Sequence, residues 1–343
     1  VKRAFALVRP PGHHAMRVVH GIRGFCVINI EAIMVAYLRQ KYGVRKIAIV
    51  DTDVHHGDGT QDIFYHDPDT LYISFHQDGR TLYPGTGFPN EAGSPAALGT
   101  NINLPLLPGT GDEGVHRLFD GIIRPILDDF EPEIIINSAG QDNHFSDPLA
   151  SMSVTAQGYA RLADKLKADI AVLEGGYSVE AALPYVNTGI ILAMAEMDYS
   201  NVIEPDQTGL RKQDEKCNAR VDELIRQIGD LWTNRQKLSS DALVKCGESW
   251  SRRKNIYYDE EGISEEQVET AHYCKQCNGY LTIQTAAENT RFGSQSAFIV
   301  IVDQCTCQAC RQKAYDEALK EKKTGKWQHV FVQDKSQGNI ENI

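Results

Sequence analysis

Short apolar segments recur along the first half of the chain. They are rich in isoleucine and valine, and they cover residues 4–8, 46–50, 71–75, 133–137 and 169–173. Helix-like stretches lie between several of them, such as residues 31–43 and 156–168. Continuous apolar strands that alternate with helices are typical of a parallel sheet covered on both faces. The pattern therefore predicts an α/β fold.

The pattern changes after about residue 200. Residues 220–238 carry apolar positions at helical spacing in a charged region. A more β-like, cysteine-bearing segment follows. We expect three parts: an α/β domain over residues 1–200, a helical linker region over 201–262 and a cysteine-rich module over 263–343.

Composition and charge narrow the function classes. The 343 residues are 42% hydrophobic, enough for one large α/β domain and a smaller module. A net charge of −11 argues against nonspecific nucleic-acid binding through a basic surface. No apolar run is long enough to span a bilayer. The start lacks the pattern of a secretory signal peptide, so we expect a cytoplasmic location without membrane partners.

Five of the eight cysteines crowd near the C-terminus. In a chain without a secretory signal, tight Cys-x-x-Cys pairs fit metal ligands better than disulfides. Cys274 and Cys277 form one pair, and Cys307 and Cys310 most simply form the other. They predict a zinc-ribbon-like structural zinc site, although the 29 residues between the pairs exceed the usual spacing and Cys305 could compete for a ligand position. The alternative is a set of reduced cysteines without metal.

Polar clusters follow the predicted strands. They are RPPGHHA (9–15), DTDVHHGDGT (51–60), SFHQDG (74–79), SAGQDNHFSDPL (138–149) and LEGGYS (173–178). In parallel α/β sheets the functional residues gather beyond the carboxyl ends of the strands. We therefore expect these five clusters to meet at one edge of the sheet.

The clusters contain candidate ligands for a divalent metal. Asp53, His55 and Asp142 offer one imidazole and two carboxylates, and extended backbone points Asp53 and His55 the same way. Three protein ligands leave a coordination position for water and substrate, as in catalytic zinc sites. The same ligand set accepts Fe(II). Taken alone, each aspartate would instead be an ordinary helix cap.

Acid–base groups accompany these ligands. His13 and His14 offer a general base and a general acid, and Asp51 and Asp58 are suited to orient their imidazoles. Tyr177, in a Gly-rich turn, can donate a hydrogen bond to a developing oxyanion. Each residue alone could be an ordinary loop residue, but five independent coincidences at strand ends argue against that reading.

In this order, the motifs resemble those of the zinc-dependent histone deacetylase family, and RPPGHHA and LEGGY resemble its class II and bacterial branch. The resemblance covers residues 1 to about 200 and implies an arginase-like α/β fold. It implies that zinc is bound by Asp53, His55 and Asp142. It also implies that the catalytic histidines His13 and His14 are backed by Asp51 and Asp58, respectively, and that Tyr177 polarises the acetyl carbonyl.

The resemblance also implies a substrate tunnel and a second cation. Phe25 and Tyr83 would wall the tunnel for the acyl-lysine side chain, and the Gly24 carbonyl would contact the substrate amide. A structural potassium ion would be held, largely through backbone oxygens, by Asp51, Asp53, His55, Ser74 and Phe75. Family members carry a further upstream segment, so we expect an N-terminally incomplete catalytic domain.

Four positions depart from the family pattern. Ile30 replaces the second Asn of GFCxxNN, Tyr83 replaces a common Phe, and Gln141 and Asn143 flank the third ligand where smaller or apolar residues are usual. None of these changes removes a predicted ligand, base or oxyanion donor.

The expected function is zinc-dependent hydrolysis of the amide of N-acetyl-lysine, in a protein or a small molecule, by a metal-activated water, the histidine pair and Tyr177. The C-terminal module would recruit a partner or a substrate. One alternative is a small-molecule deacylase such as an acetylpolyamine amidohydrolase. Leu149 argues against it, because polyamine-specific members carry an acidic residue at that rim position. The other alternative is a non-catalytic binding protein whose zinc module is the active part.

Overall fold

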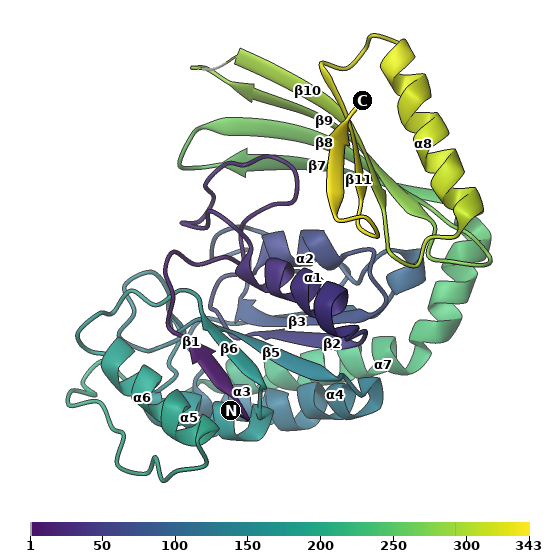
Figure 1. Ribbon diagram of the computed structural model, residues 1–343. Helices are drawn as coiled ribbons and strands as arrows, with labels where there is room; N and C mark the ends of the chain where they lie inside the picture. Colours follow the sequence, from purple (N-terminus) through teal and green to yellow (C-terminus); the bar gives the residue numbers. More distant parts are fainter. Residues whose placement is uncertain (1, 292) are drawn as a thin grey trace. The chain divides into compact units, whose positions relative to one another are not determined.

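The computed structural model describes residues 2–291 and 293–343, which divide into two compact units (Figure 1). The first unit extends to residue 235 but excludes 21–24 and 94–96. Those two short segments belong to the second unit, together with residues 236–343. The predicted division at residues 200 and 262 remains a prediction.

The first unit contains a parallel sheet, whose described strands have the order β1-β6-β5-β2-β3-β4 (Figure 1). These strands are β1 (Ala4–Ala6), β2 (Ile47–Asp51), β3 (Thr70–Gln77), β4 (Asn101–Leu106), β5 (Ile134–Ala139) and β6 (Ile170–Leu173). Every neighbouring pair is parallel. The predicted α/β fold with a parallel sheet is therefore confirmed.

Helices cover both faces of this sheet. Ile47 and Ile49 of β2 pack with Val35 of α1 (Ile30–Tyr42) and Phe64 of α2 (Asp58–Phe64). The alternating residues Ala48 and Val50 belong to the opposite apolar cluster. That cluster draws on α3 (Asp112–Leu118), α4 (Arg124–Phe130), α5 (Ala156–Leu166), α6 (Leu183–Met194) and the first part of α7 (Glu215–Cys246). Both faces are buried, which explains why β2 is apolar without alternation.

The two helix-like stretches predicted between the strands correspond to α1 and α5, and side chains cap both of their N-termini. Asn29 accepts a hydrogen bond from the Ala32 N–H at 2.9 Å, and Thr155 accepts one from the Gly158 N–H at 3.0 Å. Helix α1 ends at Gly43, whose φ of 69° suits a residue without a Cβ. Among the described residues, no helix is both long enough and apolar enough to cross a membrane.

The second unit is built on a mixed sheet, with its described strands in the order β12-β11-β10-β9-β8-β7. They are β7 (Ser249–Tyr258), β8 (Ile263–His272), β9 (Tyr280–Asn289), β10 (Gly293–Val302), β11 (His329–Asp334) and β12 (Asn339–Asn342). Only the β10–β11 pair is parallel. Helix α8 (Gln308–Lys323) connects these two strands, as a parallel crossover requires (Figure 1).

Candidate active site and cysteine cluster

The predicted metal ligands meet at the carboxyl ends of two neighbouring strands. Asp53 and His55 follow β2, Asp142 follows β5, and β2 pairs directly with β5. One ligand atom from each residue lies within 4.8 Å of the other two. His55 Nδ1 is 3.2 Å from Asp53 Oδ1 and 3.1 Å from Asp142 Oδ2. All three side chains are buried.

The surroundings of these ligands suit a divalent cation. Burial and the charge of Asp53 raise the pKa of Asp142 to about 7. Burial alone would lower the pKa of His55, but the Asp142 and Asp53 carboxylates raise it to about 10. Two buried carboxylates thus attract positive charge to this place, and a divalent metal would supply it.

Glycines let the neighbouring backbone approach the carboxylates. A Cβ at Gly175 would lie 2.2 Å from Asp142 Oδ2, and one at Gly140 would lie 2.2 Å from Asp53 Oδ2. The N–H of Gly175 donates to Asp53 Oδ2 at 2.7 Å. These two loops therefore form a close cradle around the ligands, and the donor set fits the predicted zinc.

The two histidines after β1 each contact an aspartate. His13 Nδ1 lies 3.1 Å from Asp51 Oδ2, and His14 Nδ1 lies 2.8 Å from Asp58 Oδ1. The two rings are 4.1 Å apart. The hydroxyl of Tyr72, which sequence reasoning did not single out, donates to Asp51 Oδ2 at 2.8 Å.

The environments of the histidines push their pKa values apart. Burial alone would lower the pKa of His13, but Asp53 and Asp51 raise it well above its ordinary value. Burial and the neighbouring His13 lower the pKa of His14 to about 4. Such a divergence suits a pair in which one imidazole holds a proton and the other can accept one.

Tyr177 lies in the turn that follows β6. Its N–H donates to Asp147 Oδ2 at 2.7 Å, and the Arg9 guanidinium donates to the Gly176 carbonyl at 2.9 Å. Burial and the negative charges of Asp142 and Asp53 raise the pKa of the Tyr177 hydroxyl. The hydroxyl therefore stays protonated at neutral pH and can donate a hydrogen bond.

The two aromatic residues predicted to wall the tunnel each lie beside a residue of the candidate site. The Phe25 ring lies 5.6 Å from the Tyr177 ring, and the Tyr83 ring lies 5.2 Å from the His14 ring. Leu149 is 42% exposed, and its N–H donates to Asp147. Gly24 groups with the second unit, so its predicted contact with substrate remains a prediction.

Sequence reasoning missed a buried carboxylate that holds the histidine loop. Glu174 follows β6, and its Oε2 accepts the N–H groups of Gly12 at 2.7 Å and His13 at 3.0 Å. Burial and the neighbouring Glu31 of α1 raise the pKa of Glu174. Glu174 stands in the LEGGY motif, but no spacing in the sequence links that motif to residues 12 and 13.

Three further histidines have hydrogen-bond partners and lie outside the ligand group. His56 contacts Thr86 and Gln61, His76 contacts Ser74 and the Gly87 carbonyl, and His144 contacts Ser146 and Glu204. These hydrogen bonds fit side chains that support the neighbouring loops.

The residues predicted to hold potassium lie where β2 ends beside the interior of β3. Asp51 of β2 is paired in register with Ser74 of β3, and Phe75 follows it. Both Asp51 and Ser74 are fully buried. The register is compatible with a shared cation, and the potassium ion itself remains a prediction.

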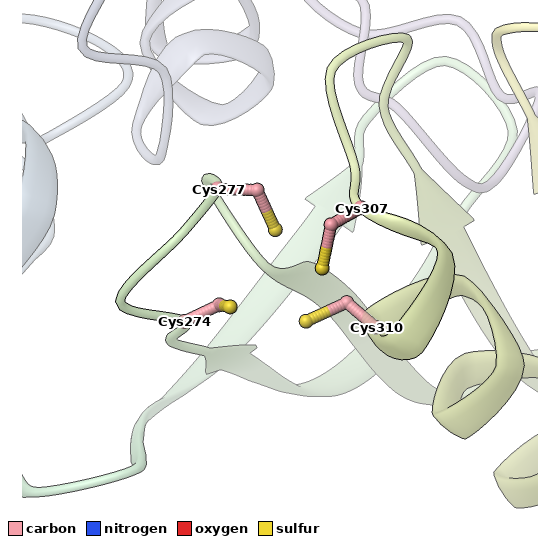
Figure 2. A group of neighbouring side chains, drawn as sticks. All are labelled: Cys274, Cys277, Cys307 and Cys310. Atoms are coloured by element: carbon pink, nitrogen blue, oxygen red, sulfur yellow. The ribbon is translucent and has the colours of Figure 1, made fainter.

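The second unit brings four cysteines together. One sulfur from each of Cys274, Cys277, Cys307 and Cys310 lies within 4.8 Å of the others, and the sulfurs point toward a common centre (Figure 2). None of the four is in a disulfide. Cys305 is exposed and lies outside this group.

Comparison with known proteins agrees with this geometry. A family model described as the histone deacetylase domain matches residues 1–192, more than half of the chain. The chain belongs to the histone deacetylase domain family. This family is zinc-dependent, and the described residues include the candidate metal ligands Asp53, His55 and Asp142.

Relatives within the histone deacetylase family carry different names. A probable deacetylase of Archaeoglobus fulgidus is 52% identical over 60% of this chain and 58% of its own length. An acetylpolyamine amidohydrolase of Burkholderia pseudomallei is 39% identical over 52% of each chain. A crystal structure of the HDA15 HD domain has a TM-score of 0.59 at 33% identity and covers 71% of this chain and 66% of that one. The chain thus spans little more than half the length of these two curated relatives.

Proposed function

We propose that this protein hydrolyses the amide of N-acetyl-lysine side chains in protein or peptide substrates. The observation that carries the proposal is the convergence of the buried Asp53–His55–Asp142 group with two aspartate-backed histidines. Membership of the histone deacetylase domain family supports it. A cytoplasmic location and recruitment of a partner by the second unit remain part of this proposal.

Asp53, His55 and Asp142 would hold the catalytic zinc ion. When bound, the metal would polarise the acyl carbonyl and lower the pKa of a water molecule. A potassium ion at Asp51, Asp53, His55, Ser74 and Phe75 would bind where β2 ends beside β3. The second, structural zinc predicted at the four cysteines takes no part in this reaction.

The histidine pair would move the protons. The low pKa of His14 leaves it neutral and able to accept a proton from the attacking water. His13 is held by Asp51 and keeps its proton, so its positive charge would stabilise negative charge in the transition state. Proton return to the leaving lysine amine completes the hydrolysis.

Tyr177 would bind the developing oxyanion. Its hydroxyl remains a donor because burial and the nearby carboxylates raise its pKa. The exposed rings of Phe25 and Tyr83 are placed beside Tyr177 and His14, respectively, where they could line the path of an aliphatic lysine side chain. Such rings exclude water from the amide and strengthen the electrostatic interactions around it.

Hydrolysis of acetylpolyamines remains the competing candidate function, because one relative is named an acetylpolyamine amidohydrolase. Leu149 argues against it. A second ammonium group on the substrate would need a carboxylate near the entrance, whereas this position is apolar and 42% exposed.

The test measures acetate release from an acetyl-lysine peptide and from an acetylpolyamine by the zinc-loaded protein. We expect the peptide to be hydrolysed, and Tyr177→Phe to lower kcat/KM about 10²- to 10³-fold, as expected for loss of one oxyanion donor. Tyr42→Phe, at an exposed position on α1, is the matched control and should retain activity.

Other results would contradict the proposal in distinct ways. Hydrolysis of the polyamine alone would show that Leu149 does not exclude that substrate. No hydrolysis of either substrate by folded, metal-loaded protein would favour the non-catalytic binding protein. Equal activity of Tyr177→Phe and wild type would remove Tyr177 from the reaction.

A further inference from the structure

Helix α8 packs on its sheet through small side chains. Its fully buried residues in the apolar cluster are Ala314 and Ala318, which face Val300 of β10 and Val332 of β11. Buried apolar area stabilises at about 25 cal/mol per Å², and alanine side chains bury little of it. Tyr315 of α8 also packs against this cluster, and Arg311 of the helix pairs with Asp334 of β11. An attachment at the N-terminus of the helix would add to these contacts.

The four-cysteine group lies at the N-terminus of this helix. Cys307 is the N-cap residue of α8, and Cys310 lies in its first turn. Cys274 and Cys277 belong to the connection between β8 and β9. The group thus brings together two segments that are about 30 residues apart in the chain.

The sulfur geometry suits one tetrahedral ion. Four thiolates at about 2.3 Å from a zinc ion would have sulfur–sulfur edges of about 3.8 Å. The observed sulfurs all lie within 4.8 Å of one another and point inward (Figure 2). Because all four ligands come from the protein, the site leaves no open position for a substrate.

The surrounding backbone is shaped to support thiolates. The N–H of Gln276 donates to Cys274 Sγ at 3.4 Å, and the N–H of Gly279 donates to Cys277 Sγ at 3.3 Å. Gly279 has a φ of +73°, and a Cβ there would lie 1.7 Å from the His272 carbonyl oxygen. Thr306 donates to the Gly279 carbonyl at 2.9 Å and so ties the two cysteine pairs together.

We propose that Cys274, Cys277, Cys307 and Cys310 bind one zinc ion in a closed tetrahedral site that fixes the N-terminus of α8 to the β8–β9 connection. The ion stabilises the second unit and performs no catalysis. Four soft thiolates in a tetrahedron select zinc or iron among the common divalent metals. The Asp53–His55–Asp142 group is a separate site, so each protein chain would carry two zinc ions.

The test begins with the metal content of the purified full chain, measured by mass spectrometry after removal of loosely bound metal. We expect two zinc ions in the wild type and one in Cys277→Ser. Cys305→Ser is the matched control, since Cys305 is exposed and outside the group, and it should keep both ions. Asp142→Asn should lose the other ion, which distinguishes failure at one site from failure at the other.

A second measurement does not depend on the folding of any variant. Wild-type protein reconstituted with Co(II) should show near-ultraviolet sulfur-to-cobalt charge-transfer absorption, which the carboxylate–imidazole site cannot produce. Absence of these bands would overturn the proposal, as would equal zinc content in wild type and Cys277→Ser. Iron in place of zinc in the purified protein would contradict the assignment of the ion.

Discussion

At the scale of single residues, Glu174 connects the strand ends to the histidine loop. Its carboxylate accepts two backbone N–H groups, from Gly12 and His13, in a fully buried place. Buried N–H groups without an acceptor cost about 1–3 kcal/mol each. Glu174 therefore holds the loop that carries the proposed acid–base pair.

Two substitutions of Glu174 distinguish the effect of its hydrogen bonds from the effect of its carboxyl group. We expect Glu174→Leu to lower the free energy of unfolding by about 2–5 kcal/mol, because both N–H groups lose their acceptor. Glu174→Gln keeps a carbonyl oxygen in the same place and should be clearly more stable than the leucine variant. Urea unfolding of the three proteins measures the difference, and equal stability of the two variants would contradict this role.

At the scale of secondary-structure elements, strands with continuous apolar runs were predictable and interrupted ones were not. Strand β4 was missed because Asn101, Asn103 and Pro105 break its apolar pattern. The asparagine amides are buried, and both donate to Gln61 Oε1 at 2.7 Å. Burial of polar side chains depends on a partner from α2, and the sequence of the strand does not contain that information.

Strand β7 illustrates a second limit. Its sequence SWSRRKNIYY is polar and charged, and it lies within the range predicted to be a helical linker. The strand is the edge of the second sheet and pairs only with β8 among the described strands. Edge strands commonly carry charged residues, so hydrophobicity is a weak signal for them.

The site shows the same division. The sequence allowed us to choose candidate site residues because parallel strands bring their carboxyl ends together. These candidates were Asp53, His55, Asp142 and the histidine pair. The contacts of Glu174 and Tyr72 could not be foreseen, since they depend on how each loop turns after its strand. Sequence patterns locate the edge of the sheet where the site forms, whereas the hydrogen bonds beneath it require the folded backbone.

Helix α5 is joined to the loop after β5 by Glu204. Glu204 Oε1 accepts hydrogen bonds from His144 Nε2 and the Ala156 N–H, both at 2.8 Å. Burial alone would raise its pKa, but these hydrogen bonds lower the pKa of Glu204 to about 2, from an ordinary value of 4.5. The carboxylate form is thus favoured in the folded protein.

This pKa shift makes the contribution of Glu204 depend on pH. Above about pH 4.5 the group is ionised in the folded and unfolded states, and its stabilisation is complete. As the pH falls toward 2 the unfolded chain takes up the proton first, and the stabilisation is lost. The stability difference between wild type and Glu204→Gln should therefore shrink over this range in urea unfolding; a constant difference would argue against the shift.

At the scale of the whole molecule, each apolar cluster of the described residues draws its members from one unit. Separate cores favour separate cooperative transitions. We expect calorimetry to resolve two thermal transitions. Val186→Ala, in α6, should lower the free energy of unfolding of the first unit, and with it the Tm of one transition. Val332→Ala, in β11, should do the same for the second unit and the other transition. We expect each loss to be about 2 kcal/mol, because each valine is fully buried. A single transition shifted by both variants would contradict this independence.

The pairing of β1 has a consequence for the synthesis of the protein. Ala4 of β1 pairs with Ile170 of β6, 166 positions later in the chain. A ribosome adds about 5–20 residues per second, so β1 emerges about 10–30 s before its neighbour exists. During that interval β1 lacks β6, the one strand with which it pairs among the described strands, although β2, β3, β4 and β5 are made in turn. The rate of translation between β1 and β6 therefore sets how long the histidine loop, which follows β1, lacks its neighbouring strand.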